Sequence, residues 1–231
     1  MLFFDPRYLI FVGPAILFAL LASLLVQSTF GKWKRVRNSS GLTGAEAASL
    51  MLTRSGLTDV SIERSSGLLS DHYDPRTRTL RLSPDVYGGQ SVASVGVALH
   101  EAGHALQHAH HYAPLALRTA LVPVASFGGG YLPWLLIMIG LLMRMPGLAM
   151  LGLVVFAVAV AFTFITLPVE FNASRRAKAA AVQLGVVGIG REASGVSAVL
   201  NAAALTYVAA AAVALLQLLY YASLVFGGRR N

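Results

Sequence analysis

The sequence contains no cysteine, and it contains few charged residues. Without cysteine the 231-residue chain can form no disulfide bond and offers no thiolate to a metal, so any metal ligands must be histidines or carboxylates. Charged residues make up 12% of the chain, about half the share that is usual in soluble globular proteins. This shortage of charge excludes an ordinary soluble domain.

Long apolar runs take the place of the missing charge, since 56% of the residues are hydrophobic and the mean hydropathy is +0.66. Four runs are long enough to cross a hydrocarbon core of about 30 Å, and they cover residues 8–26, 120–143, 147–167 and 202–226. Pro123, glycines 128 to 130 and Pro133 interrupt the second run. A weak n-region and the lack of a clear cleavage site favour an uncleaved anchor over a signal peptide for the first run.

Basic residues are concentrated on one side of these predicted spans. Of the eighteen Lys and Arg residues, all but Arg7, Arg144, Arg229 and Arg230 fall on the side that carries the long polar segment. The positive-inside rule therefore places the polar segments in the cytoplasm and both termini outside. The positive-inside rule thus accounts for most of the net charge of +8. Because the basic residues do not alternate with aromatic residues on one soluble face, we expect no nucleic-acid partner.

One sizeable polar region, about residues 31–118, carries patterns of both helix and strand. Thr43 and Glu46 have the spacing of a capping box, and Gly56 can close the helix that follows. Short alternating runs predict strands near 60–63, 70–74 and 79–82, after which Ser83 and Pro84 can open the next helix. The expected fold is mainly α, an integral membrane protein with about four transmembrane helices and a small α+β region in the cytoplasm.

The most informative run in this region is His100-Glu101-Ala102-Gly103-His104. On a helix, residues four apart share a face, so His100 and His104 can direct their imidazoles at one metal ion while Glu101 points beside it. The Ala-rich, proline-free segment 90–109 can supply that helix. Burying these side chains on an apolar helix is costly unless a cation is bound. The motif predicts a site for one zinc ion with Glu101 as general base.

Such a site needs a third protein ligand and an open position for water, and three residues are candidates. His110 sits where metzincins place their third histidine, but Gln107 replaces the glycine that turns the chain there. His108 lies another turn along the same helix, too far to reach the same ion. Glu170 is the only carboxylate in the stretch from 103 to 190, and it follows an apolar span, where an ionised side chain is costly unless bound or paired. We favour Glu170.

Longer segments resemble a known family. HEAGHALQ, preceded by SDHYDPRTRTLRLSPDVY and followed by LPVEFNASRRA and AALTYVAAA, resembles the YugP-like membrane zinc metallopeptidases over nearly the whole chain. The resemblance implies a gluzincin-type site in which His100, His104 and Glu170 hold zinc. EFNAS is also similar to the ExxAD element of HtpX-type and CAAX-prenyl proteases, with Ser174 in place of its aspartate. Asn172 stands where YugP-like sequences commonly have Asp, and it can accept a hydrogen bond from a ligand histidine without charge.

The motif and the resemblance together imply a zinc-dependent membrane endopeptidase that hydrolyses peptide bonds through a metal-bound water. Its expected partners are the lipid bilayer and peptide or membrane-protein substrates. In resembling gluzincins an edge strand binds the substrate in extended form, and here residues 70–74 or 77–83 would supply it. The candidate oxyanion donors, each of which is more often structural, are Tyr73, His72, Asn172, Arg175 and Arg176. Pairing of Glu170 with one of these arginines is the structural alternative to its role as a ligand.

This interpretation divides the chain into five parts. They are an N-terminal anchor (1–30), a catalytic region with the small sheet and the HExxH helix (31–118), a transmembrane hairpin (119–168), a third-ligand helical segment (169–201) and a C-terminal transmembrane helix (202–231).

Three other functional classes also have to be considered. An intramembrane site-2-type protease uses HExxH but needs an aspartate in a later span, whereas the second to fourth spans contain none. A membrane metal transporter could use intramembrane His and Glu but would not need Glu101 beside a ligand. A zinc-binding scaffold would keep the ligands without turnover.

Overall fold

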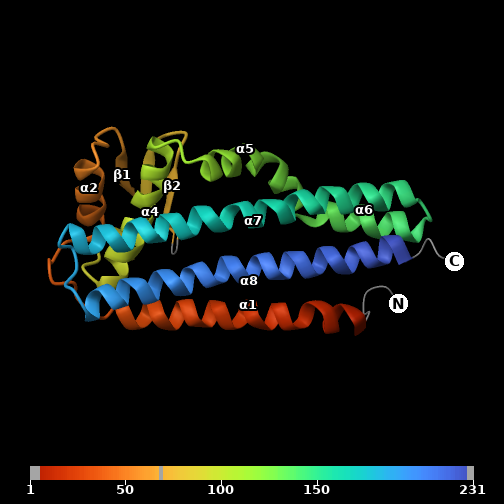
Figure 1. Ribbon diagram of the computed structural model, residues 1–231, viewed down its shortest axis with the longest axis horizontal. Coiled ribbons are helices and arrows are strands. Elements are labelled where there is room, and N and C mark those ends of the chain that lie inside the picture. Colours follow the sequence, from red (N-terminus) through yellow and green to blue (C-terminus); the bar gives the residue numbers. More distant parts are fainter. Residues whose placement is uncertain (1–5, 68–69, 228–231) are drawn as a thin grey trace. The chain divides into compact units, whose positions relative to one another are not determined.

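A computed structural model describes residues 6–67 and 70–227 of the chain, and its fold is mainly α, as predicted (Figure 1). The predicted positions of the two termini, with Arg229 and Arg230, lie outside the described residues. The helices and strands are α1 (Pro6–Trp33), α2 (Gly44–Arg54), β1 (Ser61–Arg64), β2 (His72–Asp74), β3 (Thr79–Leu82), α3 (Pro84–Tyr87), α4 (Val92–Ala109), α5 (Ala113–Gly128), α6 (Tyr131–Leu142), α7 (Pro146–Gln183) and α8 (Arg191–Gly227).

The chain divides into two compact units, to both of which α1, α5, α7 and α8 contribute. Unit 1 comprises Met1–Ala22, Leu117–Leu167 and Thr206–Asn231. Unit 2 comprises Ser23–Ala116 and Pro168–Leu205. In α7 the boundary falls at Pro168, which has no backbone N–H to donate to the helix. All polar elements between α1 and α5 therefore belong to unit 2.

Unit 1 consists of apolar helices. The helices α1, α7 and α8 are each long and apolar enough to cross a membrane. A fourth candidate span is formed by α5 and α6, which are bent by 50° at a short break. This break follows Gly128, where the sequence predicts an interruption of the second span. Large apolar side chains such as Leu20, Leu142 and Val154 are exposed on these helices, which suits a lipid environment better than water.

Unit 2 holds the three-stranded sheet, in the order β1-β3-β2. The central strand β3 pairs in parallel with β1 and antiparallel with β2, so β1 and β2 are the edges. Leu80 and Leu82 of β3 are fully buried and pack in one core with Leu52 of α2 and Leu99 of α4. The sheet and the core thereby fix one face of α4.

Local signals in the sequence set the bounds of the elements in unit 2. Thr43 and Glu46 form the predicted capping box at the start of α2, and Gly56, at φ +75°, follows the end of that helix. Ser83 and Pro84 open α3 as predicted, although the Ser83 side chain makes no capping hydrogen bond. A second cap, Ser91, accepts a hydrogen bond from the backbone N–H of Ser94 and starts α4.

The helices α4 and α7 lie in close contact at Gly103. A Cβ atom at this position would lie 3.0 Å from the carbonyl oxygen of Ala173 and 3.2 Å from its Cα. Both neighbours are backbone atoms, which cannot turn aside as a side chain can. Gly96, two turns earlier on the same helix, faces the side chain of Val196 instead, and a Cβ atom there would make an ordinary contact of 3.5 Å. Of these two glycines, only Gly103 is needed for the close contact between the helices.

We expect Gly103→Ala to destabilise unit 2 and Gly96→Ala to leave it unchanged or slightly more stable. Overpacking costs about 1–3 kcal/mol, which at position 103 outweighs the gain of about 1 kcal/mol in helix propensity. At position 96 only that gain remains. Thermal unfolding of the two purified variants in the same detergent measures the difference. Equal melting temperatures would show that α4 and α7 are not held at contact distance.

Candidate active site

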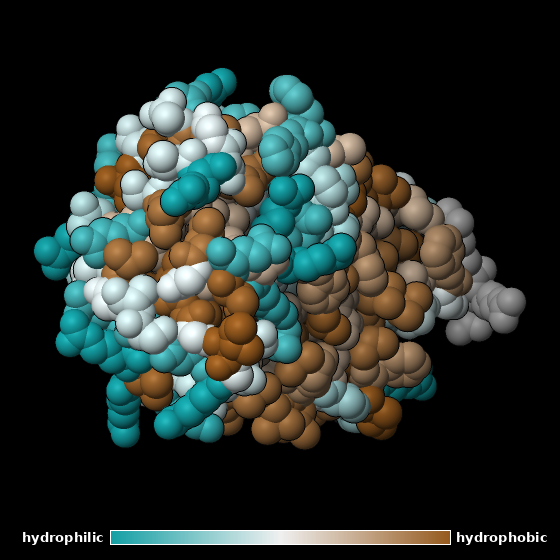
Figure 2. All heavy atoms as spheres, turned by 60° about the vertical axis from the view of Figure 1, so that its left-hand side comes forward, coloured by the Kyte–Doolittle hydropathy of each residue, from teal (hydrophilic) through white to brown (hydrophobic). Residues whose placement is uncertain are grey.

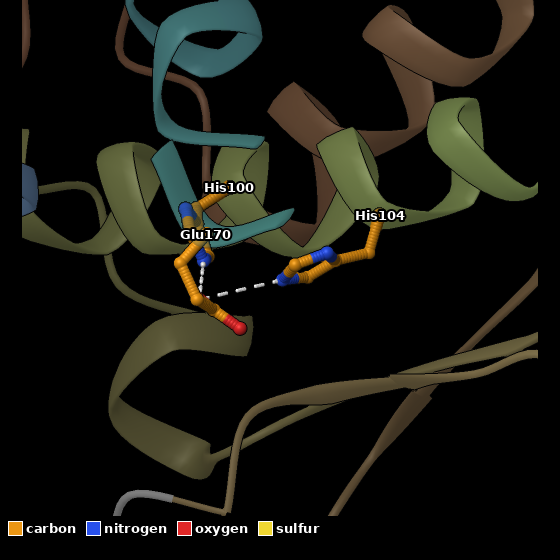
Figure 3. A group of neighbouring side chains, drawn as sticks. All are labelled: His100, His104 and Glu170. Atoms are coloured by element: carbon orange, nitrogen blue, oxygen red, sulfur yellow. Dashed lines mark hydrogen bonds and ion pairs between the residues drawn. The ribbon is translucent and has the colours of Figure 1, made fainter. Parts of the chain in front are cut away.

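Three side chains from two helices converge in unit 2 (Figure 3). His100 and His104 lie one turn apart on α4, with their ring centroids 4.9 Å apart, and Glu170 reaches them from α7. The Nε2 atoms of His100 and His104 lie 3.2 Å and 3.7 Å from the same carboxylate oxygen, Oε2 of Glu170. One potential ligand atom from each of the three residues thus faces a common point.

The spacing of these atoms suits a zinc ion. Tetrahedral coordination with bonds of 2.0–2.1 Å places ligand atoms about 3.3 Å apart, and the three atoms here lie within 4.8 Å of one another. Two imidazoles and one carboxylate are also the donor set of many hydrolytic zinc sites. His104 and Glu170 are buried, and His100 is only partly exposed. The residues present therefore fit the metal that the sequence predicts.

Each histidine is also held at its other ring nitrogen. The Nδ1 atom of His100 lies 3.1 Å from the Ser174 hydroxyl, which belongs to α7. The Nδ1 atom of His104 lies 3.0 Å from Oε1 of Gln107, three residues along α4. Such partners fix the rotation of an imidazole and leave Nε2 for the metal. Ser174, at the position of the aspartate in the ExxAD element, thus contacts a predicted ligand directly.

Gln107 is the site residue that the sequence does not reveal. Its side chain is fully buried, and its amide nitrogen donates to the carbonyl of Val169 at 2.8 Å and to Oδ1 of Asn172 at 3.0 Å. The sequence pattern marks Gln107 only as the wrong residue for a metzincin turn. A glutamine seven residues after His100 lies on the face of the histidines, and this spacing is the signal that could have found it.

Asn172 takes a different place from the one predicted. Its Oδ1 atom accepts hydrogen bonds from Gln107 and, at 2.8 Å, from Nε of Arg176. The expected direct bond to a ligand histidine is made by Gln107 instead. The reason is geometric, since Gln107 shares the helix of His104 and Asn172 does not. Asn172 and Arg176 therefore form the outer end of a chain of hydrogen bonds that begins at His104.

Glu101 follows His100 on α4 and is partly buried. Burial raises the pKa of its carboxyl group above the ordinary value, and the nearby His100 and His104 offset this in part. Burial alone would lower the pKa of His104, but the hydrogen bond to Glu170 and the charge of Glu101 raise it overall. The carboxylates of Glu101 and Glu170 thus stabilise a positive charge at His104, and a bound cation would supply such a charge.

The remaining candidates lie apart from the three convergent side chains or contact one another. Tyr73 of β2 bonds through its hydroxyl to Nδ1 of His108 at 2.9 Å. His72 is exposed and bonds to the carbonyl of Ser70. His110 ends α4 and lies 3.4 Å from Arg176, and Arg175 is exposed on α7. The structure thus groups Glu170, and not His110 or His108, with His100 and His104.

Comparisons with known proteins also indicate a zinc-dependent peptidase. Residues 8–226 match the model of a family described as "Putative neutral zinc metallopeptidase". The chain is also similar to the "Putative membrane protease YugP" of Bacillus subtilis (strain 168), with 49% identity over 208 residues that cover 90% of this chain and 92% of the relative. No solved structure matches the chain significantly.

We expect Gln107→Leu to weaken zinc binding by about 10- to 100-fold, because it removes the acceptor that orients His104. Gln107→Glu keeps an acceptor for His104 but loses the N–H that donates to Val169 and Asn172, so it should recover only part of the affinity. Competition with a chromogenic chelator measures both values.

The matched control is Gln90→Leu, which removes a side-chain hydrogen bond to the Gly41 carbonyl, outside the group of candidate ligands. Zinc binding of this control should stay at the wild-type level. If Gln107→Leu and Gln90→Leu lose the same affinity, the effect reflects general loosening of unit 2 rather than the orientation of His104.

Proposed function

The chain belongs to the zinc metallopeptidase family whose model it matches, and from that premise we propose that it is a membrane endopeptidase that uses one zinc ion. The observation that carries the proposal is the convergence of His100, His104 and Glu170, with Glu101 beside His100 on the same helix. A site that only stored or carried a metal would have no need of a carboxylate at that position.

In this proposal His100, His104 and Glu170 hold the ion. When bound, zinc acts as a Lewis acid that acidifies water and polarises a peptide carbonyl. Glu101 takes one proton from the attacking water and delivers it to the nitrogen of the leaving amine as the C–N bond breaks. The partly buried side chain of Glu101 directly follows His100 on α4, which puts it beside the proposed ligands, where a general base is needed. Ser174 and Gln107 keep the two imidazoles in place.

The sheet offers a place for the substrate. Strand β2 is an edge strand and packs against α4, so its outer edge has unpaired backbone groups next to the helix of the candidate ligands. An extended peptide can add to such an edge through main-chain hydrogen bonds, with little demand on sequence. We therefore propose unfolded peptide segments, including those of membrane proteins, as the substrate class.

The evidence that the chain is a membrane protein differs from the evidence for the side of the membrane on which unit 2 lies. The apolar helices and the match to a membrane protease make the chain a membrane protein. We propose that it crosses the plasma or inner membrane several times with unit 2 in the cytoplasm, because fourteen of the eighteen Lys and Arg residues fall on that side of the predicted spans.

A panel of three variants tests the site. Glu101→Gln should keep about one equivalent of zinc and lose at least about a hundredfold in hydrolysis of an unfolded membrane-protein reporter, because glutamine keeps the volume and cannot accept the proton. Glu170→Ala should lose zinc after dialysis against a mild chelator, since one of three protein ligands is gone. His110→Ala should keep both zinc and activity.

Metal content and reporter cleavage are measured on all three proteins, with the wild type plus chelator as the inactive reference. Turnover by Glu101→Gln at the wild-type rate would reject the assignment of the base. Loss of zinc from His110→Ala together with its retention by Glu170→Ala would reject the proposed ligand set.

Single cysteines test the orientation, since the chain has no native thiol. Thr53 is exposed on α2 in unit 2, and Met143 is exposed after α6 in unit 1. An impermeant thiol reagent applied to intact cells should label Met143→Cys and should label Thr53→Cys only after lysis. The reverse pattern would place the candidate active site outside the cell.

A further inference from the structure

Unit 2 also contains a cavity whose lining includes none of the candidate ligands. It is a cavity of about 580 Å³ that opens at the N-terminal end of α4. Its walls come from the segment after α1, from the last residue of β1, and from α3 with the loop that joins it to α4. Ser91 lies on its wall, nine residues before His100, which corresponds to roughly 14 Å along the helix axis. The cavity is therefore not part of the candidate active site.

Its lining is strongly basic. Lys34, Arg35, Arg37 and Arg64 face the cavity, against a single acidic residue, Asp85. Asp85 pairs with Lys34 at 2.6 Å. Among the residues that the structure describes, no acidic side chain pairs with any of the three arginines. The start of α4 adds the partial positive charge of a helix N-terminus.

Two other arginines of unit 2 do have acidic partners. Arg78 pairs with Asp59, and Arg81 lies within 3.4 Å of both Glu63 and Asp74. The positive-inside rule explains why cations follow a membrane span, but it does not explain why unpaired ones surround a cavity. Unpaired cations in a concave site indicate an anionic ligand.

The wall of the cavity is held by hydrogen bonds and is ready-made. The side chain of Asn38 donates to the carbonyls of Leu42 and Gln90, and the Gln90 side chain donates to the carbonyl of Gly41. The backbone N–H of Val92 donates to Val36 at 2.8 Å, which ties the start of α4 to the segment after α1. A ligand in this cavity would therefore pay little to order the loops around it.

The place of the cavity in the chain identifies the ligand. Lys34 directly follows α1, which ends at Trp33 and is long and apolar enough to cross a membrane. Lys32, Lys34, Arg35 and Arg37 form a basic cluster at this end of the span, and such clusters attract anionic lipid headgroups. Hydrophilic side chains also gather over the outer surface of unit 2 (Figure 2). We propose that the cavity binds the phosphate of an anionic phospholipid headgroup through Arg35, Arg37 and Arg64.

Native mass spectrometry of the full chain in neutral detergent tests this proposal, with short-chain phosphatidylglycerol, short-chain phosphatidylcholine and inorganic phosphate as probes. The wild type should retain one phosphatidylglycerol at concentrations that leave phosphatidylcholine unbound. Arg37→Gln with Arg64→Gln should weaken that binding at least about tenfold. The matched control, Arg54→Gln with Arg76→Gln, removes the same charge from exposed positions of unit 2 outside the cavity and should bind as the wild type does.

Each other outcome overturns the proposal. Equal losses in the two double variants would show diffuse attraction rather than a site. Equal retention of the two lipids would exclude recognition of an anionic headgroup, and inorganic phosphate that binds as tightly as phosphatidylglycerol would assign the cavity to a soluble anion. Zinc content and melting temperature confirm that each variant is folded. Arg35→Gln, a single exchange, replaces the double variant if that protein does not fold.

Discussion

The contact of α4 with α7 at Gly103 and Ala173 is the constraint on which the candidate active site depends. The two histidines share α4, so their spacing follows from helix geometry alone. Glu170 comes from another helix, and its carboxylate reaches them only because the helix backbones approach to the distance of a missing Cβ atom. The bonds from Ser174 to His100 and from Gln107 to Val169 cross the same contact. One small residue thus brings together all the groups that the proposed chemistry needs.

The features that the sequence predicts well are those set by nearby residues. The capping box of Thr43 and Glu46, the interruption after Gly128 and the helix of the HExxH run each depend on a few neighbouring positions. The strands of the small sheet are also found within a residue or two, because their alternation is local. The sequence predicts that Glu170 reaches the histidines because an isolated carboxylate next to an apolar span is costly, although nothing in the spacing of the residues indicates that contact.

The features that the sequence does not reveal depend on which side chains meet across the fold. In the sequence, Gln107 indicates only that a metzincin turn is absent. In the structure, its side chain forms a hydrogen bond with His104. Asn172 was expected to hold a histidine and instead accepts from Gln107 and Arg176. From the sequence, the basic residues after the first span indicate only membrane topology, because their arrangement around a cavity depends on how β1 and α3 fold against them. In each case the sequence reveals the residue type but not its partner.

The chain of hydrogen bonds from Arg176 to His104 has a direction, and Arg176 sets it. A guanidinium group can only donate, so the side chain of Asn172 must turn its oxygen towards Arg176. That same oxygen then requires the nitrogen of Gln107, which leaves the oxygen of Gln107 for His104. His104 must in turn carry its proton on Nδ1, with a bare lone pair on Nε2. A charge about two turns of α7 beyond Glu170 thus selects the imidazole tautomer that can bind a metal, and the neutral Asn172 transmits the choice that an aspartate would make by itself.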